Sequence, residues 1–297
     1  MDLKAYLKER CILVDEALGR FLHKEDELPA SLHKSMRYSV FAGGKRVRPI
    51  LMLAACEAVG GKLEAAMPAA CAMEMIHTYS LIHDDLPAMD DDDFRRGNPT
   101  NHKVFGEAIA ILAGDALLTQ AFILMSAPEY SAGIEPARLI EVIHEIGRCA
   151  GSHGMVGGQV VDMESEGKAN IDLATVLYIH THKTGALIKA SVKAGAILGG
   201  ADSKALSAIT GYGEAVGLAF QIADDILDIE GTTEELGKDA GSDEARGKAT
   251  YPAIAGLADS KRRAGELVEM ALESLAGFDA KADPLREIAK YIVYRKS

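Results

Sequence analysis

Several residue types are scarce in this sequence. It has no tryptophan, 4 cysteines and 9 prolines, and aromatic residues make up 5% of its 297 positions. The cysteines are dispersed and form no CxxC pair; they are Cys11, Cys56, Cys71 and Cys149. This dispersal argues against a zinc site or a disulfide framework and is typical of proteins in a reducing compartment. We therefore expect a cytoplasmic protein.

Long apolar runs are also missing. The N-terminal stretch MDLKAYLKERCILVDEALGRFL is charged at helical intervals and lacks the unbroken apolar run of a signal peptide. Even the run AIAILAGDALL contains Asp115, and no apolar run reaches the about 18 residues that span a bilayer. We expect a protein without stable membrane insertion.

Positive charge is in short supply. Because 32 basic residues face 44 acidic residues, the formal net charge is -12. Nucleic acid and anionic membrane surfaces are therefore not expected as partners, since both require a basic footprint. An acidic chain can still bind an anionic ligand where metal ions or a local basic cluster reverse the sign of the charge in one cleft.

Sustained two-residue alternation of apolar and polar residues is absent, so a sheet is not expected. Apolar residues recur instead at intervals of three and four residues. This pattern predicts one all-α domain over residues 1–297, with about ten helices around a deep central cleft. The predicted helices cover roughly 3–20, 62–82, 107–125, 136–149, 172–198, 204–229, 252–275 and 284–294.

The stretch HDDLPAMDDDDFRRGNPT holds six aspartates between Asp84 and Asp93. So many like charges would oppose folding unless something neutralised them. A helix is expected to end in Asp84 and Asp85, after which Pro87 disrupts the regular turn and lets Asp90 return near Asp84. A solvated acidic loop is the alternative for this stretch taken alone, and its spacing does not match an EF-hand.

A second acidic cluster lies in AFQIADDILDIEG. On a helix, Asp224 and Asp228 share a face, Asp225 is adjacent, and Gln221 lies one turn earlier on the same side. Mg²⁺ takes few carboxylate ligands and keeps its other positions for water or phosphate oxygens. Two such clusters therefore predict Mg²⁺ ions that bridge to phosphate, and Mn²⁺ is the open alternative.

Basic residues lie beside these acids. Arg95 and Arg96 follow the first cluster, and GGKRVRP offers Lys45, Arg46 and Arg48 at the start of a predicted helix. Cations oppose the macrodipole at a helix N-terminus, so an anion is expected there, although a solvated basic turn is the alternative. The further basic candidates are Lys183, Lys238 and Lys248. The sequence thus predicts a cleft that stabilises a diphosphate leaving group and shelters a carbocation between apolar walls.

The motifs GGKRVRP, LIHDDLPAMDDDDFRRGNPTNH, GQVVDM, HKTGAL and FQIADDILD, followed by GKDAG and GKATYP, occur in this order. The set resembles the trans-isoprenyl diphosphate synthases over most of the chain, and among them the bacterial-type farnesyl diphosphate synthases, or geranyltranstransferases. The resemblance implies the isoprenoid-synthase fold and a homodimer. It also implies condensation of isopentenyl diphosphate with dimethylallyl or geranyl diphosphate to give farnesyl diphosphate.

The same resemblance implies roles for individual residues. Three Mg²⁺ ions would be held by Asp84, Asp85, Asp90, Asp224, Asp225 and Asp228. The allylic diphosphate would be bound by Arg95, Lys183, Lys238 and Lys248, and isopentenyl diphosphate by Gly44, Lys45, Arg48, His77 and Arg96. Thr184, Gln221 and the Lys183 carbonyl would offer dipoles to the allylic cation, and the released diphosphate would accept the proton. The residues expected to be structural or supporting are His83, His180, His182 and Asp162.

Product length is expected to depend on Tyr79 and Ser80. Tyr79 precedes Asp84 by five residues, about 7.5 Å along a helix. If the prenyl tail grows down this helix, the Tyr79 ring would form the floor of the pocket, as the resemblance to fifteen-carbon synthases also implies. A core tyrosine without such a role is the alternative.

Three other functions stay open. A geranylgeranyl diphosphate synthase would share the chemistry and have a deeper pocket. A terpene cyclase is disfavoured because the second aspartate motif is intact. A non-catalytic partner subunit that binds divalent ions would be expected to lack some of these ligands, and none is missing.

Overall fold

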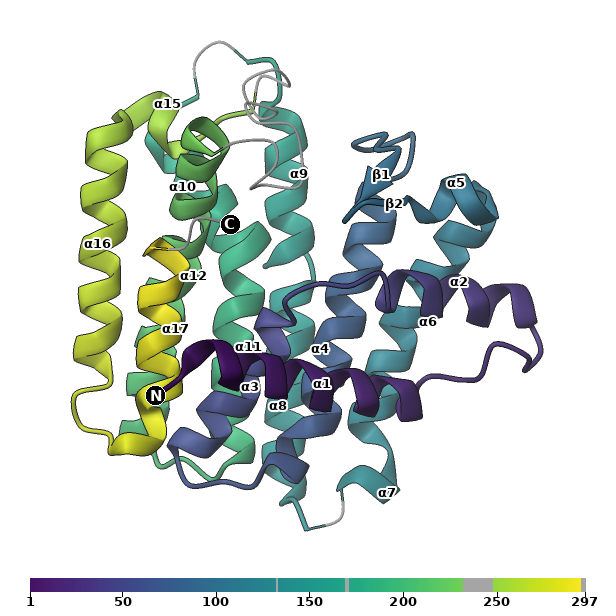
Figure 1. The fold of residues 1–297 in the computed structure, drawn as a ribbon, viewed down its shortest axis with the longest axis horizontal. Coiled ribbons are helices and arrows are strands. Elements are labelled where there is room, and N and C mark those ends of the chain that lie inside the picture. Colours follow the sequence, from purple (N-terminus) through teal and green to yellow (C-terminus); the bar gives the residue numbers. More distant parts are fainter. Residues whose placement is uncertain (132, 169–170, 232–247, 295–297) are drawn as a thin grey trace.

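The computed structural model describes residues 1–131, 133–168, 171–231 and 248–294, which form a helical protein and confirm the predicted all-α class (Figure 1). The α-helices are α1 (Leu3–Phe21), α2 (Ala30–Val40), α3 (Val47–Ala58), α4 (Leu63–Asp84), α5 (Asn101–Phe105), α6 (Glu107–Ser126), α7 (Pro128–Ser131), α8 (Pro136–Ala150), α9 (Met155–Ser165), α10 (Leu173–Ile179), α11 (Ala186–Leu198), α12 (Ser203–Glu230), α15 (Tyr251–Ala255), α16 (Leu257–Ser274) and α17 (Asp283–Tyr294). A π-helix, η1 (His180–Gly185), joins α10 to α11, and a 3₁₀ turn, η2 (Ala280–Ala282), precedes α17.

The longest helices occupy the predicted ranges, but five of the shorter ones lie outside those ranges. These are α2, α3, α5, α7 and α9, of which α3 had its start expected at GGKRVRP. The range 172–198 is interrupted by η1, and the range 252–275 is broken at Gly256, whose φ of 82° lies outside the helical region. Helical periodicity therefore located the long elements and missed these breaks.

One hairpin is the exception to the helical pattern in the described residues. Strand β1 (Phe94–Arg95) pairs antiparallel with β2 (Asn98–Pro99). The two residues between them, Arg96 and Gly97, have φ of 55° and 78°, as tight two-residue hairpins require. The hairpin matters because it carries both arginines that follow the first acidic cluster.

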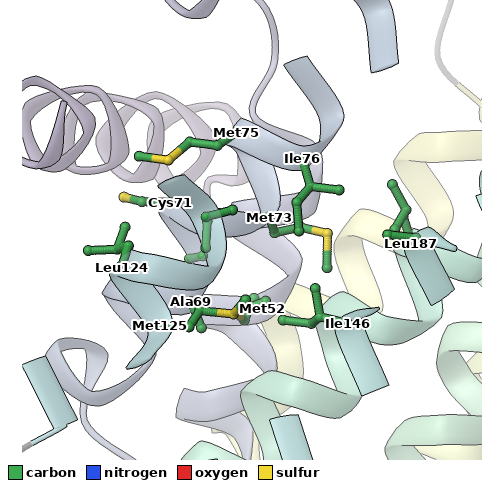
Figure 2. Close-up of a cluster of buried hydrophobic side chains, with 14 of the residues drawn as sticks. Met52, Ala69, Cys71, Met73, Met75, Ile76, Leu124, Met125, Ile146 and Leu187 are labelled. Carbon is green, nitrogen blue, oxygen red and sulfur yellow. The ribbon is translucent and has the colours of Figure 1, made fainter. Parts of the chain in front are cut away.

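Two hydrophobic clusters make up the core, and α3 and α11 contribute to both. The first lies among α1, α3, α4, α6, α8 and α11, where Figure 2 shows Met52, Met73 and Ile146 packed together. The second lies among α3, α11, α12, α16 and α17. Because α3 and α11 belong to both clusters, the two clusters are packed against shared helices, as expected for one folding unit. That the chain is a single domain stays a prediction.

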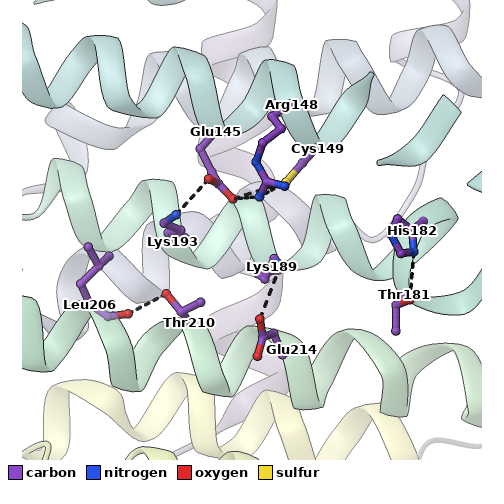
Figure 3. Close-up of polar contacts among 10 residues, drawn as sticks. All are labelled: Glu145, Arg148, Cys149, Thr181, His182, Lys189, Lys193, Leu206, Thr210 and Glu214. Atoms are coloured by element: carbon purple, nitrogen blue, oxygen red, sulfur yellow. Dashed lines mark hydrogen bonds and ion pairs between the residues drawn. The ribbon is translucent and has the colours of Figure 1, made fainter. Parts of the chain in front are cut away.

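Polar contacts also hold α11 in place (Figure 3). Glu145 on α8 is buried and pairs with Lys193 of α11 at 2.9 Å and with Arg148 of its own helix at 3.0 Å. On the other side, Lys189 of α11 lies 3.5 Å from Glu214 of α12. These pairs fix α11 between α8 and α12, and α11 directly follows η1.

Helix α6 is, among the described helices, the one that is long and apolar enough by composition to cross a membrane. Asp115 interrupts the apolar run, as the sequence shows, and the helix meets this criterion with that charge included. In this structure 39% of its most apolar window is buried, and the core helix of a globular protein meets the same criterion.

Candidate active site

The first acidic motif closes on itself at the end of α4. The amide of Asp90 donates to the carbonyl of Asp84 at 2.8 Å, and the amide of Met89 donates to Leu86 at 2.8 Å. These turns return the chain to the helix end, so the predicted approach of Asp90 to Asp84 is confirmed. Asp91, at φ 50°, completes the reversal.

Both acidic motifs face one cavity of about 630 Å³. Its lining includes Asp84 and Asp90 from the first motif and Asp224 from α12. The shared cavity predicted from the sequence is therefore present. Leu81, Phe220 and Leu227 add apolar surface to the same lining.

The other three predicted carboxylates do not line this cavity. Asp85 is buried and accepts from Arg95 Nε at 2.6 Å, and Arg95 Nη2 lies 2.5 Å from the same oxygen. Asp225 and Asp228 on α12 are buried as well. Metal ligation by these three residues stays a prediction.

The lining carboxylates suit a hard cation that also binds phosphate. Within the described residues, no group of three or more His, Cys, Asp or Glu side chains is arranged to hold a metal. The first motif and Asp224 offer carboxylate oxygens alone, and Mg²⁺ completes its octahedron with water or phosphate oxygens. The donor set therefore fits Mg²⁺ bound together with a diphosphate.

Burial and neighbouring charge change the acidity of Asp84. Removal from water raises its pKa to about 6, with Asp90 and Asp85 adding to the increase and Lys183 and Arg95 opposing it. A carboxylate that is costly to charge without a ligand is typical of a site completed by cations.

Cations surround the carboxylates in the same cavity. Its lining includes Lys45, Arg48, Arg95, Arg96 and Lys183. The cavity of a chain with net charge -12 thus carries a local basic cluster, as the sequence predicted. Arg48 Nε is buried and has no hydrogen-bond partner among the described residues, so this side chain has donor capacity left for an anionic ligand.

Arg46 differs from its neighbours in GGKRVRP. Its backbone is left-handed, with φ of 48°, and its side chain turns into the protein. There it pairs with Asp15 and Glu74, each at 2.8 Å, and donates to the Val40 carbonyl at 2.6 Å. Arg46 lines the cavity as well, but its Nε, Nη1 and Nη2 donate to these protein partners.

Gly44 allows Arg96 to approach the loop before α3. Gly44 has φ of 127°, and a Cβ there would lie 2.5 Å from Arg96 Nη1. Arg96 also donates to the carbonyl of Gly43. The glycines thus seat the hairpin arginine against the loop that carries Lys45.

Lys183 reaches the cavity from η1. Its ammonium lies 2.6 Å from Asp162 of α9. Burial alone would lower the pKa of Lys183, but Asp162, together with Asp84 and Asp90, raises it. The helices α9 and η1 approach closely because Gly158 has no side chain: a Cβ there would lie 2.3 Å from the Lys183 amide nitrogen.

His77 and Gln221 also line the cavity. Burial, followed by the charges of Arg48 and Arg96, lowers the pKa of His77 well below its ordinary value, so the imidazole is neutral. Gln221 Nε2 donates to Asp225 at 3.3 Å. Thr184 on η1 is half-buried and lies outside the cavity lining.

The residues expected to set product length lie on α4 but not in the lining of this cavity. Tyr79 is buried, and its ring packs edge-on against His83 with centroids 5.8 Å apart. Ser80 donates to the His77 carbonyl at 2.8 Å. A role for either residue in product length stays a prediction.

Of the two lysines expected in the loop after α12, the structure describes one. Lys248 Nζ lies 4.0 Å from Asp90 Oδ2, which brings it to the first acidic motif. Lys238 lies outside the described residues.

Sequence reasoning missed Glu74. Glu74 lines the cavity and pairs with Arg46. The available signal was a lone carboxylate in the apolar helix stretch AACAMEMIHTY, since a buried charge requires a partner. His180, expected to be structural, is buried with Nε2 3.2 Å from Asp225 Oδ2.

Comparisons with known proteins match the whole chain. A family model described as Polyprenyl synthetase matches residues 29–288. The dimethylallyltranstransferase of Fischerella ambigua (strain UTEX 1903) is 52% identical over 99% of this chain and 84% of that protein. The farnesyl diphosphate synthase of Geobacillus stearothermophilus is 48% identical over 99% of this chain and 98% of that protein. Among solved structures, geranylgeranyl pyrophosphate synthetase from Pyrococcus horikoshii Ot3 has a TM-score of 0.90 at 33% identity, covering 99% of this chain and 98% of that one.

Proposed function

The chain belongs to the polyprenyl synthetase family and is a prenyltransferase of isoprenoid biosynthesis, and we propose that it makes farnesyl diphosphate. Its substrates would be isopentenyl diphosphate and dimethylallyl or geranyl diphosphate. The observation that carries this proposal is the single cavity in which Asp84, Asp90 and Asp224 face a basic cluster. Such a cavity suits two diphosphates held side by side.

Bound Mg²⁺, held by Asp84, Asp90 and Asp224, would neutralise the charge that develops on the departing diphosphate. Arg95 and Lys183 would bind the allylic diphosphate together, one from the hairpin and the other from η1, since both line the cavity. Their fixed positive charges stabilise the leaving group as the carbon–oxygen bond breaks.

Isopentenyl diphosphate would be bound by Lys45, Arg48 and Arg96 beside Gly44. Its double bond supplies the electron pair for the new carbon–carbon bond to the allylic cation, and a proton is then lost to the released diphosphate. Because His77 is neutral, it adds no positive charge next to the cation. Gln221 offers a side-chain dipole, and Phe220 and Leu227 keep water from the cation.

The fifteen-carbon product is supported by the bulky Tyr79 on α4 and by the farnesyl diphosphate synthase among the relatives. The twenty-carbon alternative has support from the solved geranylgeranyl pyrophosphate synthetase. Incubation with labelled isopentenyl diphosphate, Mg²⁺ and each allylic primer, followed by chromatography, tests both. We expect farnesyl diphosphate from both shorter primers and no extension of farnesyl diphosphate itself.

Two outcomes of this assay would change the proposal. Extension of the farnesyl primer would make the protein a geranylgeranyl diphosphate synthase. No turnover with any primer would favour the interpretation that the protein is a non-catalytic partner that binds divalent ions.

We also propose a homodimer that uses the outer face of α6. Ile111, Leu112 and Ile123 on this helix are 44%, 52% and 53% exposed. Apolar side chains gathered on one exposed helix face are typical of an interface. Light scattering should give twice the monomer mass, and Leu112→Glu should reduce it to one monomer mass. A monomeric wild-type protein would contradict the proposal.

A further inference from the structure

Asp225 is fully engaged by protein groups. Its Oδ2 accepts from the Tyr251 amide at 2.8 Å and lies 3.2 Å from His180 Nε2, while its Oδ1 accepts from Gln221 at 3.3 Å. It is 3% exposed and does not line the cavity that Asp224 lines. These contacts use both oxygens of the carboxylate.

His180 is as deeply buried as its partner, with 4% exposed. Its other ring nitrogen, Nδ1, is buried and has no hydrogen-bond partner among the described residues. The polar contact of this imidazole is therefore the one with Asp225. A buried polar ring with a single partner is costly to disrupt, so the pair is held in one arrangement.

The pair connects two elements that line the cavity, η1 and α12, to a third, α15, which begins just after Lys248. His180 is the first residue of η1, which also carries Lys183. Asp225 is on α12 next to Asp224, and Tyr251 is the first residue of α15, three residues after Lys248. A direct backbone contact accompanies the pair, since a Cβ on Gly217 of α12 would lie 2.9 Å from Gly185 of η1.

We propose that His180 and Asp225 are a positioning pair that sets Lys183 and Lys248 relative to Asp224. The inference rests on the proposed function and gives Asp225 a role other than the metal ligation expected from the sequence. The imidazole donates through Nε2 and fixes the carboxylate, and the carboxylate fixes the start of α15. Loss of either side chain would let η1, α12 and α15 shift relative to one another.

Four variants test this assignment. His180→Phe removes the donor and keeps a ring, His180→Gln keeps an amide donor, Asp225→Asn weakens the acceptor, and Asp224→Asn alters a carboxylate of the cavity. Hydrogen exchange is measured first on ligand-free protein, in a peptide that begins at or before Lys248 and covers Tyr251–Ala255, so that the Tyr251 amide is retained. We expect faster exchange in His180→Phe and Asp225→Asn and near-normal exchange in His180→Gln, because the Tyr251 amide loses its fixed acceptor in the first two.

Steady-state kinetics with an allylic substrate follow. For His180→Phe and Asp225→Asn, kcat/KM should fall by about 10- to 100-fold, as for supporting partners of other sites, with recovery in His180→Gln. The double variant His180→Phe/Asp225→Asn should have the same kcat/KM as the less active of the two single variants, because both substitutions remove the same interaction. The half-saturating Mg²⁺ concentration should rise in Asp224→Asn alone.

Three results would overturn the assignment. Asp225→Asn that raises the Mg²⁺ requirement as Asp224→Asn does would make Asp225 a ligand. Normal exchange and kinetics in His180→Phe would remove the pair. Equal losses of activity and Tm in His180→Phe and His180→Gln would reduce it to a packing contact. If the wild-type protein makes no prenyl diphosphate, the proposed function fails, and the exchange comparison still decides whether the pair holds Tyr251.

Discussion

Arg46 and Lys45 are adjacent in the sequence, yet replacing Arg46 should lower the stability of the protein, whereas replacing Lys45 should weaken substrate binding. The Arg46 side chain is 1% exposed and pairs with Glu74, which is 2% exposed, at 2.8 Å. Arg46→Met would leave Glu74 as a buried carboxylate without its partner. Breaking a buried ion pair from one side costs about 3–5 kcal/mol, which corresponds to about 6–20 °C in Tm at about 2–4 °C per kcal/mol.

The matched control is Lys45→Met. Lys45 is exposed at the cavity rim, and surface substitutions usually change stability by less than about 0.5 kcal/mol. We expect an unchanged Tm and a raised KM for isopentenyl diphosphate. Differential scanning fluorimetry and urea unfolding measure the stability of both variants. Initial rates measure function, and each variant is assayed about 20 °C below its own Tm, a margin as large as the expected shift.

A double variant separates charge from packing. Arg46→Met/Glu74→Leu removes both buried charges, so it should recover at least half of the lost stability, because an apolar pair of similar volume is often as stable as the ion pair. The exposed Asp15 carboxylate remains in water. Arg46→Met within about 1 kcal/mol of the wild type would show that the pair contributes no more than a surface salt bridge, and the reasoning would be refuted.

Three further predictions follow from the site. Tyr79→Ala should lengthen the main product on chromatography, whereas Tyr79→Phe keeps the ring and should not; an unchanged distribution in the first variant would exclude Tyr79 as the floor. The pKa of Asp84 is raised from 3.8 to about 6, so the folded protein holds this proton more tightly than the unfolded chain does. The contribution of Asp84 to the free energy of unfolding therefore decreases as pH rises from 3.8 to about 6. Since a protonated carboxyl does not ligate Mg²⁺, the stabilisation of the diphosphate complex by Mg²⁺ should weaken below about pH 6; thermal shifts independent of pH would contradict this. Gly158→Ala should lower kcat, because its Cβ would lie 2.3 Å from the Lys183 amide nitrogen, whereas Gly147→Ala, with Phe122 at 3.6 Å, should leave kcat unchanged.

The carboxylates that line the cavity were predictable because helix geometry and a proline-broken turn are local properties. Asp84 and Asp90 required a turn of a few residues, and Asp224 required the face of one helix. The orientation of Arg46 and Asp225 was not predictable in this way. Each is decided by a partner distant in the sequence, Glu74 for the first and His180 for the second.

In the fold, too, the features set by local sequence were predictable, and those set by distant contacts were not. Long helices such as α4 and α12 follow from apolar periodicity. Helix α9 contains two adjacent glycines, and its position depends on the close approach to η1 that Gly158 allows, a tertiary contact with no local signature. Local propensity is a weak prior wherever such contacts decide the structure.

The π-helix η1 makes the spacing of residues as important as their identity. An α-helix advances about 100° per residue, and a π turn takes up one residue more than an α turn. Deleting one residue between His180 and Gly185 would let the π turn close into an α turn and would leave the flanking helices in register. Inserting one residue would instead rotate whatever precedes it by about 100° relative to α11, which is anchored by Leu187 and by the contact of Glu145 with Lys193. Lengthening of this segment is therefore expected to be tolerated far less well than most single exchanges of side chains within it.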